Sequence, residues 1–334
     1  MSYLKRIISF ATCIACIVSL MLCGTTTALA AETATPDKPI MLDNGLQVRW
    51  FNNAGFEMIL PSGKHLLVDP WLDSSNTFAF SVEQVEQYDY VLLSHIHSDH
   101  AGDIKALENK FSRFVLMVGD FDVDPLCEWQ DLDLRNVYRV RDGAKYSFDD
   151  VTVEVFGSRH TEAPQPALRS KSYKEDSENA NSGWWGNFEV LNYLITTSDG
   201  TKVLVWAGMT TEDQKNLFKD LHPDIAFMHL SPKSDAKIFA QMVASWGPKL
   251  VVPHHYDAIK AGVEQKPDQI DRNLSKEYQE LFLKYDANKV ASFDEAAYVN
   301  YFGDEITRQC PTAQILQMEH HKWYRFSTAY AVVD

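Results

Sequence analysis

Cysteine is scarce in this sequence, and three of the five cysteines lie within the first 23 residues. Only Cys127 and Cys310 remain in the rest of the chain, far apart and outside the histidine-rich motifs described below. A disulfide between them is compatible with an exported protein, but two such distant cysteines do not predict one. Cysteine therefore does not enter the candidate ligand sets.

Basic residues are also few, with 31 Lys and Arg against 46 Asp and Glu, which gives a formal charge of −15. Without the first 30 residues, which hold two of the basic residues, the charge would be about −17. An acidic surface repels phosphate backbones, so we expect no nucleic-acid partner. The alternative explanation of the acidity is solubility outside the cell. The sequence also lacks a Gly-x-Ser-x-Gly run and a Walker-type loop, which disfavours a serine hydrolase and a phosphate-binding loop.

The N-terminus has the pattern of a secretory signal. Lys5 and Arg6 precede an apolar stretch from Ile7 to Cys23, and Ala28-Leu29-Ala30 forms a small-x-small cleavage site. We predict a signal peptide over residues 1–30 and an exported protein, periplasmic or extracellular, with no transmembrane segment in the mature chain. A lipoprotein is the less favoured alternative, because Leu22 is too large for the position before the cysteine of a lipobox.

The strongest signal is the run from Ser94 to Asp103, which holds three imidazoles and a carboxylate within six positions. These are ligands that zinc and similar divalent ions accept. His95 and His97 are two residues apart in an extended turn, so both can reach one ion. Asp99 and His100 then face a neighbouring position for a second ion. A solvated histidine tract could bind metal adventitiously, but this one directly follows an apolar run typical of a buried strand.

The motif His-x-His-x-Asp-His resembles the signature of the metallo-β-lactamase superfamily. That resemblance implies an α/β fold, a four-layer αβ/βα sandwich with two mixed β-sheets and a metal centre at one edge. It also implies a third histidine after a later strand, for which His160 is the best match. A final histidine near a proline is expected, and His255 fits by position. His254 is the less favoured ligand by position and could instead support a ligand or face the substrate; one sequence does not settle the register.

Two further positions follow from the resemblance. Asp69 resembles the aspartate that lies beneath the motif and hydrogen-bonds a metal ligand, although Asp-Pro is also an ordinary strand end. Family members carry an aspartate in a Gly-Asp-Thr turn that bridges two ions, whereas this chain has Met209 there. A thioether is a poor ligand for such ions, and Asp213 is a weak substitute.

The expected metal centre is therefore unequal. His95, His97 and His160 form a complete three-histidine site, whereas Asp99, His100 and His255 form a second site without its shared ligand. We expect one tightly bound Zn²⁺ and a weaker second site, with Mn²⁺ as an alternative metal.

The rest of the chain is assigned from its periodicity and turn residues. Residues 31–46 are expected to be a flexible mature N-terminus, residues 47–267 a metallo-β-lactamase-like domain, and residues 268–334 a C-terminal extension packed on the same domain. Trp184 and Trp185 end a polar insertion and could either wall a substrate pocket or plug the sandwich edge. Strands are expected at residues 47–51, 56–60, 65–69, 89–93, 114–118, 151–156, 188–196, 202–206, 224–229 and 249–252. Helices are expected at residues 102–111, 211–220, 235–245 and 274–285.

These features predict an exported metal-dependent hydrolase that uses a metal-bound hydroxide on an ester, lactone or phosphodiester, with Asp99 orienting the water or taking its proton. Several segments are similar to the branch of L-ascorbate-6-phosphate lactonase-like and N-acyl-phosphatidylethanolamine phospholipase D-like proteins, which implies a small-molecule or lipid-like substrate. The alternative is a catalytically impaired, metal-loaded binding protein, because Met209 replaces the bridging aspartate. The oligomeric state is not readable from the sequence.

Overall fold

The computed structural model describes residues 45–160 and 189–326. The expected signal peptide, Trp184 and Trp185 lie outside the described residues. The first strand already begins at Leu46, the last residue of the segment expected to be flexible. Within the described part of the chain, no helix is both long enough and apolar enough to span a membrane.

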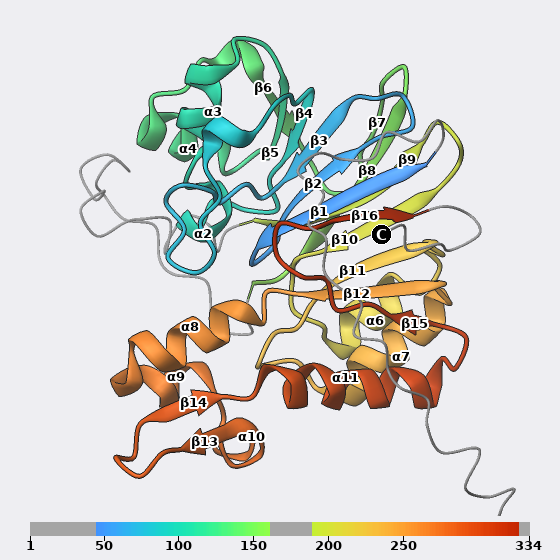
Figure 1. Ribbon diagram of the computed structural model, residues 1–334. Coiled ribbons are helices and arrows are strands. Elements are labelled where there is room, and N and C mark those ends of the chain that lie inside the picture. Colours follow the sequence, from blue (N-terminus) through green and yellow to red (C-terminus); the bar gives the residue numbers. More distant parts are fainter. Residues whose placement is uncertain (1–44, 161–188, 327–334) are drawn as a thin grey trace, which may run out of the picture. The chain divides into compact units, whose positions relative to one another are not determined.

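Two seven-stranded mixed sheets form the centre of the fold (Figure 1). In the first sheet the strands lie in the order β16 (Trp323–Phe326), β1 (Leu46–Asn52), β2 (Gly55–Ile59), β3 (His65–Val68), β4 (Tyr90–Leu92), β5 (Val115–Gly119) and β6 (Val137–Val140). In the second the order is β15 (Gln314–Ile315), β12 (Leu250–His254), β11 (Ile225–His229), β10 (Lys202–Trp206), β9 (Val190–Thr197), β8 (Val151–Ser158) and β7 (Lys145–Ser147). Each sheet has an antiparallel part and a parallel part.

Helices cover the outer sides of both sheets. α3 (Ile104–Lys110) and α4 (Val123–Gln130) pack on the first sheet, whereas α6 (Glu212–Leu217), α7 (Ala236–Trp246) and α11 (Glu295–Gln309) lie beside the second. The remaining elements among the described residues are α2 (Ser98–Ala101), α8 (Asp257–Gln265), α9 (Ile270–Asn273), α10 (Lys276–Phe282), the hairpin of β13 (Leu283–Tyr285) and β14 (Ala291–Phe293), and the short 3₁₀ turns η1 (Val82–Gln84), η2 (Leu134–Asn136) and η4 (Pro267–Gln269). The predicted α/β sandwich is confirmed.

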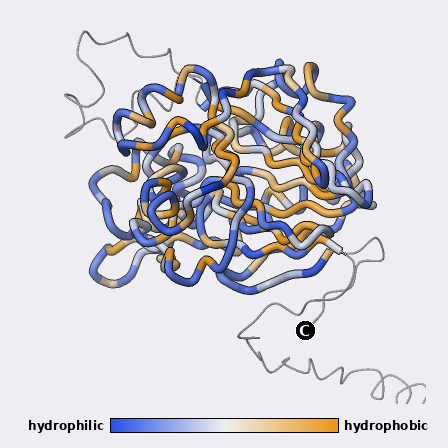
Figure 2. The backbone as a smooth tube through the Cα atoms, turned by 90° about the horizontal axis from the view of Figure 1, so that it is seen from above, coloured by the Kyte–Doolittle hydropathy of each residue, from blue (hydrophilic) through white to orange (hydrophobic). Residues whose placement is uncertain are grey.

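Alternating side chains of the central strands belong to two different cores. Leu66 and Leu92 face the core between the sheets, whereas Leu67 and Val91 pack beneath α3 and α4. Strands buried on both faces read as continuous apolar runs, which explains why β3 and β4 are detectable in the sequence. Figure 2 shows hydrophobic stretches of the backbone running through the interior and hydrophilic stretches mostly around the outside.

The structure adds elements that the sequence did not predict. The C-terminal extension supplies an edge strand to each sheet, because β16 pairs antiparallel with β1 and β15 pairs parallel with β12. The aromatic-rich segment around Tyr298 and Phe302 is the helix α11, and the predicted helix over 274–285 ends at Phe282, where β13 begins. Cys127 and Cys310 are both free thiols.

Candidate metal centre

The histidine-rich loop lies between β4 and α2 and is held from below by a buried carboxylate. Asp69, at the end of β3, accepts hydrogen bonds from the Ser94 backbone N–H at 2.7 Å and from the Ser94 hydroxyl at 2.6 Å. Gly102 ends the motif where space is short, because a Cβ there would lie 2.5 Å from the backbone oxygen of Ser98. The local sequence thus fixes the path of the loop that presents the imidazoles.

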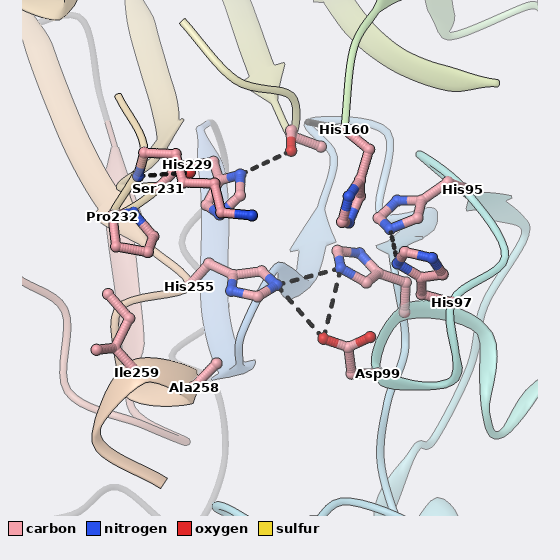
Figure 3. A pocket seen from close by; sticks show the side chains of 13 residues that line it. His95, His97, Asp99, His160, His229, Ser231, Pro232, His255, Ala258 and Ile259 are labelled. Atoms are coloured by element: carbon pink, nitrogen blue, oxygen red, sulfur yellow. Dashed lines mark hydrogen bonds and ion pairs between the residues drawn. The ribbon is translucent and has the colours of Figure 1, made fainter. Parts of the chain in front are cut away.

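Three histidines form a first cluster. The ligand atoms of His95, His97 and His160 lie within 4.8 Å of one another, and His95 Nε2 is 2.9 Å from His97 Nδ1 (Figure 3). His97 Nε2 and His160 Nδ1 are buried and have no hydrogen-bond partner among the described residues. A buried polar nitrogen without a partner is costly, and a bound cation removes that cost. The arrangement fits a divalent metal ion.

A second cluster lies beside the first. It consists of Asp99, His100 and His255, whose ligand atoms also lie within 4.8 Å of one another. His100 Nε2 is 3.2 Å from His255 Nε2, and Asp99 Oδ2 is 3.5 Å from His255 Nε2. His255 follows β12 in a left-handed conformation with φ of +67°, which turns its ring towards the loop of the first sheet. The rings of His95 and His100 are 3.9 Å apart, so the two clusters adjoin.

Burial and neighbouring charges set the protonation of these groups. Burial lowers the pKa of His97 to about 4 and holds the pKa of His95 well below its usual range, which keeps both rings in the neutral form that binds metals. Burial opposes the ionisation of Asp99, but His100 and His255 outweigh it and keep the pKa of Asp99 well below its usual range. Burial likewise opposes protonation of His100, whereas Asp99 and Asp69 raise its pKa. A bound cation would take the place of the proton on His100.

Asp69 also contacts the second cluster directly. Its side chain is fully buried, and Oδ2 lies 2.9 Å from Nδ1 of His100. Because an ionised carboxylate only accepts hydrogen bonds, Nδ1 carries the hydrogen towards Asp69, and Nε2 is the atom of His100 that faces the cluster. The structure therefore places Asp69 in hydrogen-bond contact with His100, a candidate ligand.

Asn53, in the turn between β1 and β2, links several parts of the centre and was not singled out as a site residue from the sequence. Its side-chain amide donates to Asp99 Oδ2 at 3.1 Å, and its backbone oxygen accepts from the backbone N–H of His255 at 3.0 Å. Its backbone N–H donates to Asp257 Oδ2 at 2.8 Å. The partners of Asn53 are 46 and about 200 residues away in sequence, so only the fold reveals this role.

His320, in the C-terminal extension, packs beneath the metal centre. Its ring is stacked between Trp50 and Phe78, with centroid separations of 3.9 and 3.7 Å. Its Nε2 lies 3.2 Å from Oδ2 of the buried Asp257, the same oxygen that accepts from Asn53. The C-terminal extension thus supports the turn beneath the metal centre.

The remaining sequence candidates lie outside the clusters. Met209 is buried, and its backbone N–H donates to the Arg159 carbonyl at 2.9 Å. Asp213 is exposed on α6, and His254 is buried with Nε2 3.1 Å from the Trp206 carbonyl. Of the two adjacent histidines that the sequence left open, the structure brings His255 and not His254 into a cluster.

His229, the last residue of β11, lies in the centre but was missed in the sequence. Its ring centroid is 4.5 Å from that of His255, and its Nδ1 lies 2.8 Å from the carbonyl oxygen of Ala207. Figure 3 shows the ring next to His255 and facing the same cavity. Burial, together with His255 and His254, lowers its pKa well below the usual range. The signal available in the sequence was a histidine at the end of the strand expected at residues 224–229.

Both clusters open into one cavity of about 300 Å³. Opposite the histidines, its wall is formed by small, apolar and hydroxyl-bearing side chains and one lysine. These residues are Ala207, Ser231, Pro232, Lys233, Ala258 and Ile259. The centre is therefore accessible to a small organic molecule.

Comparison with known proteins gives a consistent result. The family described as "Beta-lactamase superfamily domain" matches residues 47–255. A protein of Methanobrevibacter smithii described as a UPF0173 metal-dependent hydrolase is 27% identical over 233 residues, which cover 66% of this chain and 86% of that protein. A protein of the same description from Bacillus thuringiensis subsp. konkukian is 30% identical over 221 residues, covering 64% and 86% of the two chains.

Solved structures show the same fold at low identity. Igni18, described as a novel metallo hydrolase from Ignicoccus hospitalis, superposes with a TM-score of 0.56 at 13% identity and covers 85% of this chain and 99% of its own. The metallo-beta-lactamase fold protein YhfI from Bacillus subtilis gives a TM-score of 0.52 at 12% identity and covers 85% and 100%. At these identities the likeness concerns the fold alone.

Proposed function

Because the chain belongs to the beta-lactamase superfamily and is a metal-dependent hydrolase of that superfamily, we propose that it hydrolyses an ester, lactone or phosphodiester at the two ligand clusters. The observation that carries this proposal is the convergence of both clusters on one cavity. Nitrogen ligands with a single carboxylate suit zinc, and manganese is the alternative.

Different side chains of the centre would have different roles in the hydrolysis. His95, His97 and His160 would hold a divalent ion, which would make a water molecule more acidic and polarise a carbonyl or phosphoryl oxygen. Asp99, whose side chain is 32% exposed and whose pKa is held well below its usual range, can orient the attacking water or take its proton when no second ion is tightly bound. Asn53 holds one oxygen of Asp99, and Asp69 holds the ring of His100.

The cavity lining supports a small or lipid-like substrate. Ala258, Ile259 and Pro232 offer an apolar wall, and Lys233 adds a cation at the same cavity. An ester or phosphodiester with an apolar group and a negative charge would match both features. The sequence likeness to the ascorbate-6-phosphate lactonase-like and phospholipase D-like branch points to the same substrate classes.

Turnover and metal content test the proposal together. The zinc- and manganese-loaded protein should hydrolyse at least one compound from a panel of lactones, phosphodiesters and esters, and chelation should abolish the activity. His222→Ala removes an exposed histidine outside the cavity and serves as the matched control. A fully metal-loaded protein that binds panel compounds without turnover would favour the alternative of an impaired binding protein, for which the loss of a carboxylate at Met209 is the supporting observation.

We also propose that the protein is exported and begins at Ala31 after cleavage. The support is the basic, apolar and small-residue order of residues 1–30. Intact-mass measurement of protein recovered from its host should show the loss of those 30 residues. A chain that begins at a lipidated Cys23 would instead show a tethered lipoprotein.

A further inference from the structure

The second cluster has three protein ligands, Asp99, His100 and His255, but not the carboxylate expected to be shared between the two ions. Zinc in proteins usually takes four ligands, so a further position is open to a neighbouring side chain or a water molecule. The turn expected to supply a bridging carboxylate carries Met209, which is buried and does not line the cavity. Asp213 is exposed on α6, so neither residue of that segment fills the gap.

His229 lies against the same turn. The carbonyl that it contacts belongs to Ala207, two residues before Met209, at a distance of 2.8 Å. β11 runs parallel to β12, so the end of β11 lies beside the start of the loop that carries His255. The ring of His229 lines the cavity and lies 4.5 Å from the ring of His255.

The hydrogen bond to Ala207 also decides which nitrogen is available. A carbonyl oxygen only accepts, so Nδ1 of His229 carries the hydrogen, and Nε2 of the neutral ring keeps its lone pair. Metal-binding histidines typically donate their other N–H in this way to a carbonyl or carboxylate, as His100 does to Asp69. His254 differs, because its Nε2 faces the Trp206 carbonyl and its ring is not part of the cavity wall.

We propose that His229 supplies Nε2 as a fourth protein ligand to the ion held by Asp99, His100 and His255, in place of the carboxylate that Met209 lacks. The inference rests on the proposed metal centre. Asp99 then remains the sole anionic ligand among the residues of the two clusters. A ligand set this rich in imidazole favours zinc over manganese more strongly than a carboxylate-bridged centre would.

Calorimetric titration of the metal-free protein with Zn²⁺ tests the inference. The informative variant is His229→Asn, whose side-chain N–H can still donate to Ala207 while Nε2 is removed. We expect the second ion to bind at least about tenfold more weakly, as for the loss of a group that orients a ligand, and the first ion to bind unchanged. The visible spectrum of the Co²⁺-loaded protein should change in the bands of the second ion alone.

Further variants keep the result interpretable. His222→Ala should leave both affinities and the Co²⁺ spectrum unchanged, and a thermal melt of each metal-free variant checks that it is folded. His229→Gln removes the ring by a different substitution and should weaken the second ion as well. Unchanged second-ion affinity and spectrum in folded His229→Asn would overturn the assignment of His229. If the proposed metal centre itself is wrong, the result is different, because the wild-type protein then binds no zinc.

Discussion

The two clusters of the metal centre differ in how the protein holds them. In the first cluster, His97 Nε2 and His160 Nδ1 are buried without a partner among the described residues. In the second, Asp69 orients His100, and Asn53 touches both Asp99 and the backbone of His255. The first cluster therefore depends on a cation to satisfy its buried nitrogens, whereas the second is oriented in advance but has Met209 at the turn where a bridging carboxylate was expected.

The largest effect is expected from the first cluster. The double substitution His95→Ala with His97→Ala should remove the tight ion and lower turnover on the order of a thousandfold or more. The reason is that polarisation of the substrate by the metal lowers the activation barrier by several kcal/mol. Elemental analysis and initial rates measure the two effects. Metal content equal to that of the wild type would show that these residues are not the ligands.

Removal of the metal should destabilise the folded protein mainly through loss of the ion in the first cluster. Zinc at a thousand times its dissociation constant stabilises the folded state by about 4 kcal/mol. Chelation should therefore lower the melting temperature of the wild type, and added zinc should restore it. The double variant, which lacks two imidazoles of the first cluster, should respond much less to either treatment when followed by circular dichroism. An equal response in both proteins would place the stabilising ion elsewhere.

Asp69→Asn tests the support of the second cluster. The amide keeps the shape of the side chain but loses the charge that orients His100, so we expect roughly a 10- to 100-fold weaker second ion and little change in the first. Calorimetric titration with zinc measures the affinities of the two ions separately. Asp69 also binds the Ser94 backbone and hydroxyl, so the melting temperature of the variant must be measured alongside. Equal weakening of both ions would show that Asp69 acts on the whole loop.

Met209→Asp should reduce the difference in zinc affinity between the two clusters. A carboxylate at this turn would add a negative charge where two dications repel each other, so the second ion should bind about tenfold tighter. The first ion should change less. Since His229 adds no charge in our account, the gain should persist while His229 is intact. Two equally tight ions in the wild type, with no gain in the variant, would mean that the shared charge is already supplied.

The smallest effect is expected at Asn53. Asn53→Gly keeps both backbone contacts and suits the positive φ of 40°, but removes the amide that donates to Asp99. Loss of one hydrogen bond to a charged group costs about 1.5–3 kcal/mol at most, and solvent at Asp99 will reduce this. We expect up to roughly tenfold weaker second-ion binding in calorimetry. An unchanged affinity would show that Asp99 is held by the metal alone.

The sequence predicted the sheets because their strands are apolar runs, and it predicted the motif ligands because they are contiguous. It missed β6 and β7, which are short edge strands with exposed residues that give little periodic signal. It also missed α11, although Tyr298, Phe302 and Ile306 are buried at a spacing of four residues.

In the candidate site, too, residues close together in the sequence could be predicted and long-range contacts could not. His95, His97, Asp99 and His100 are local, and a motif can show them. His229 is a lone histidine after an apolar strand, and its chemistry depends on the Ala207 carbonyl 22 residues away. Contacts that join distant segments exist only once both sheets have formed, so a single sequence does not reveal them.

Anomalous diffraction from crystals of the zinc-loaded protein, recorded on both sides of the zinc edge, tests the central claim most directly. Our account predicts two peaks, one among His95, His97 and His160 and a second among Asp99, His100 and His255, with the second weaker when zinc is limiting. Peaks absent from both clusters, or zinc held only elsewhere on the chain, would contradict it.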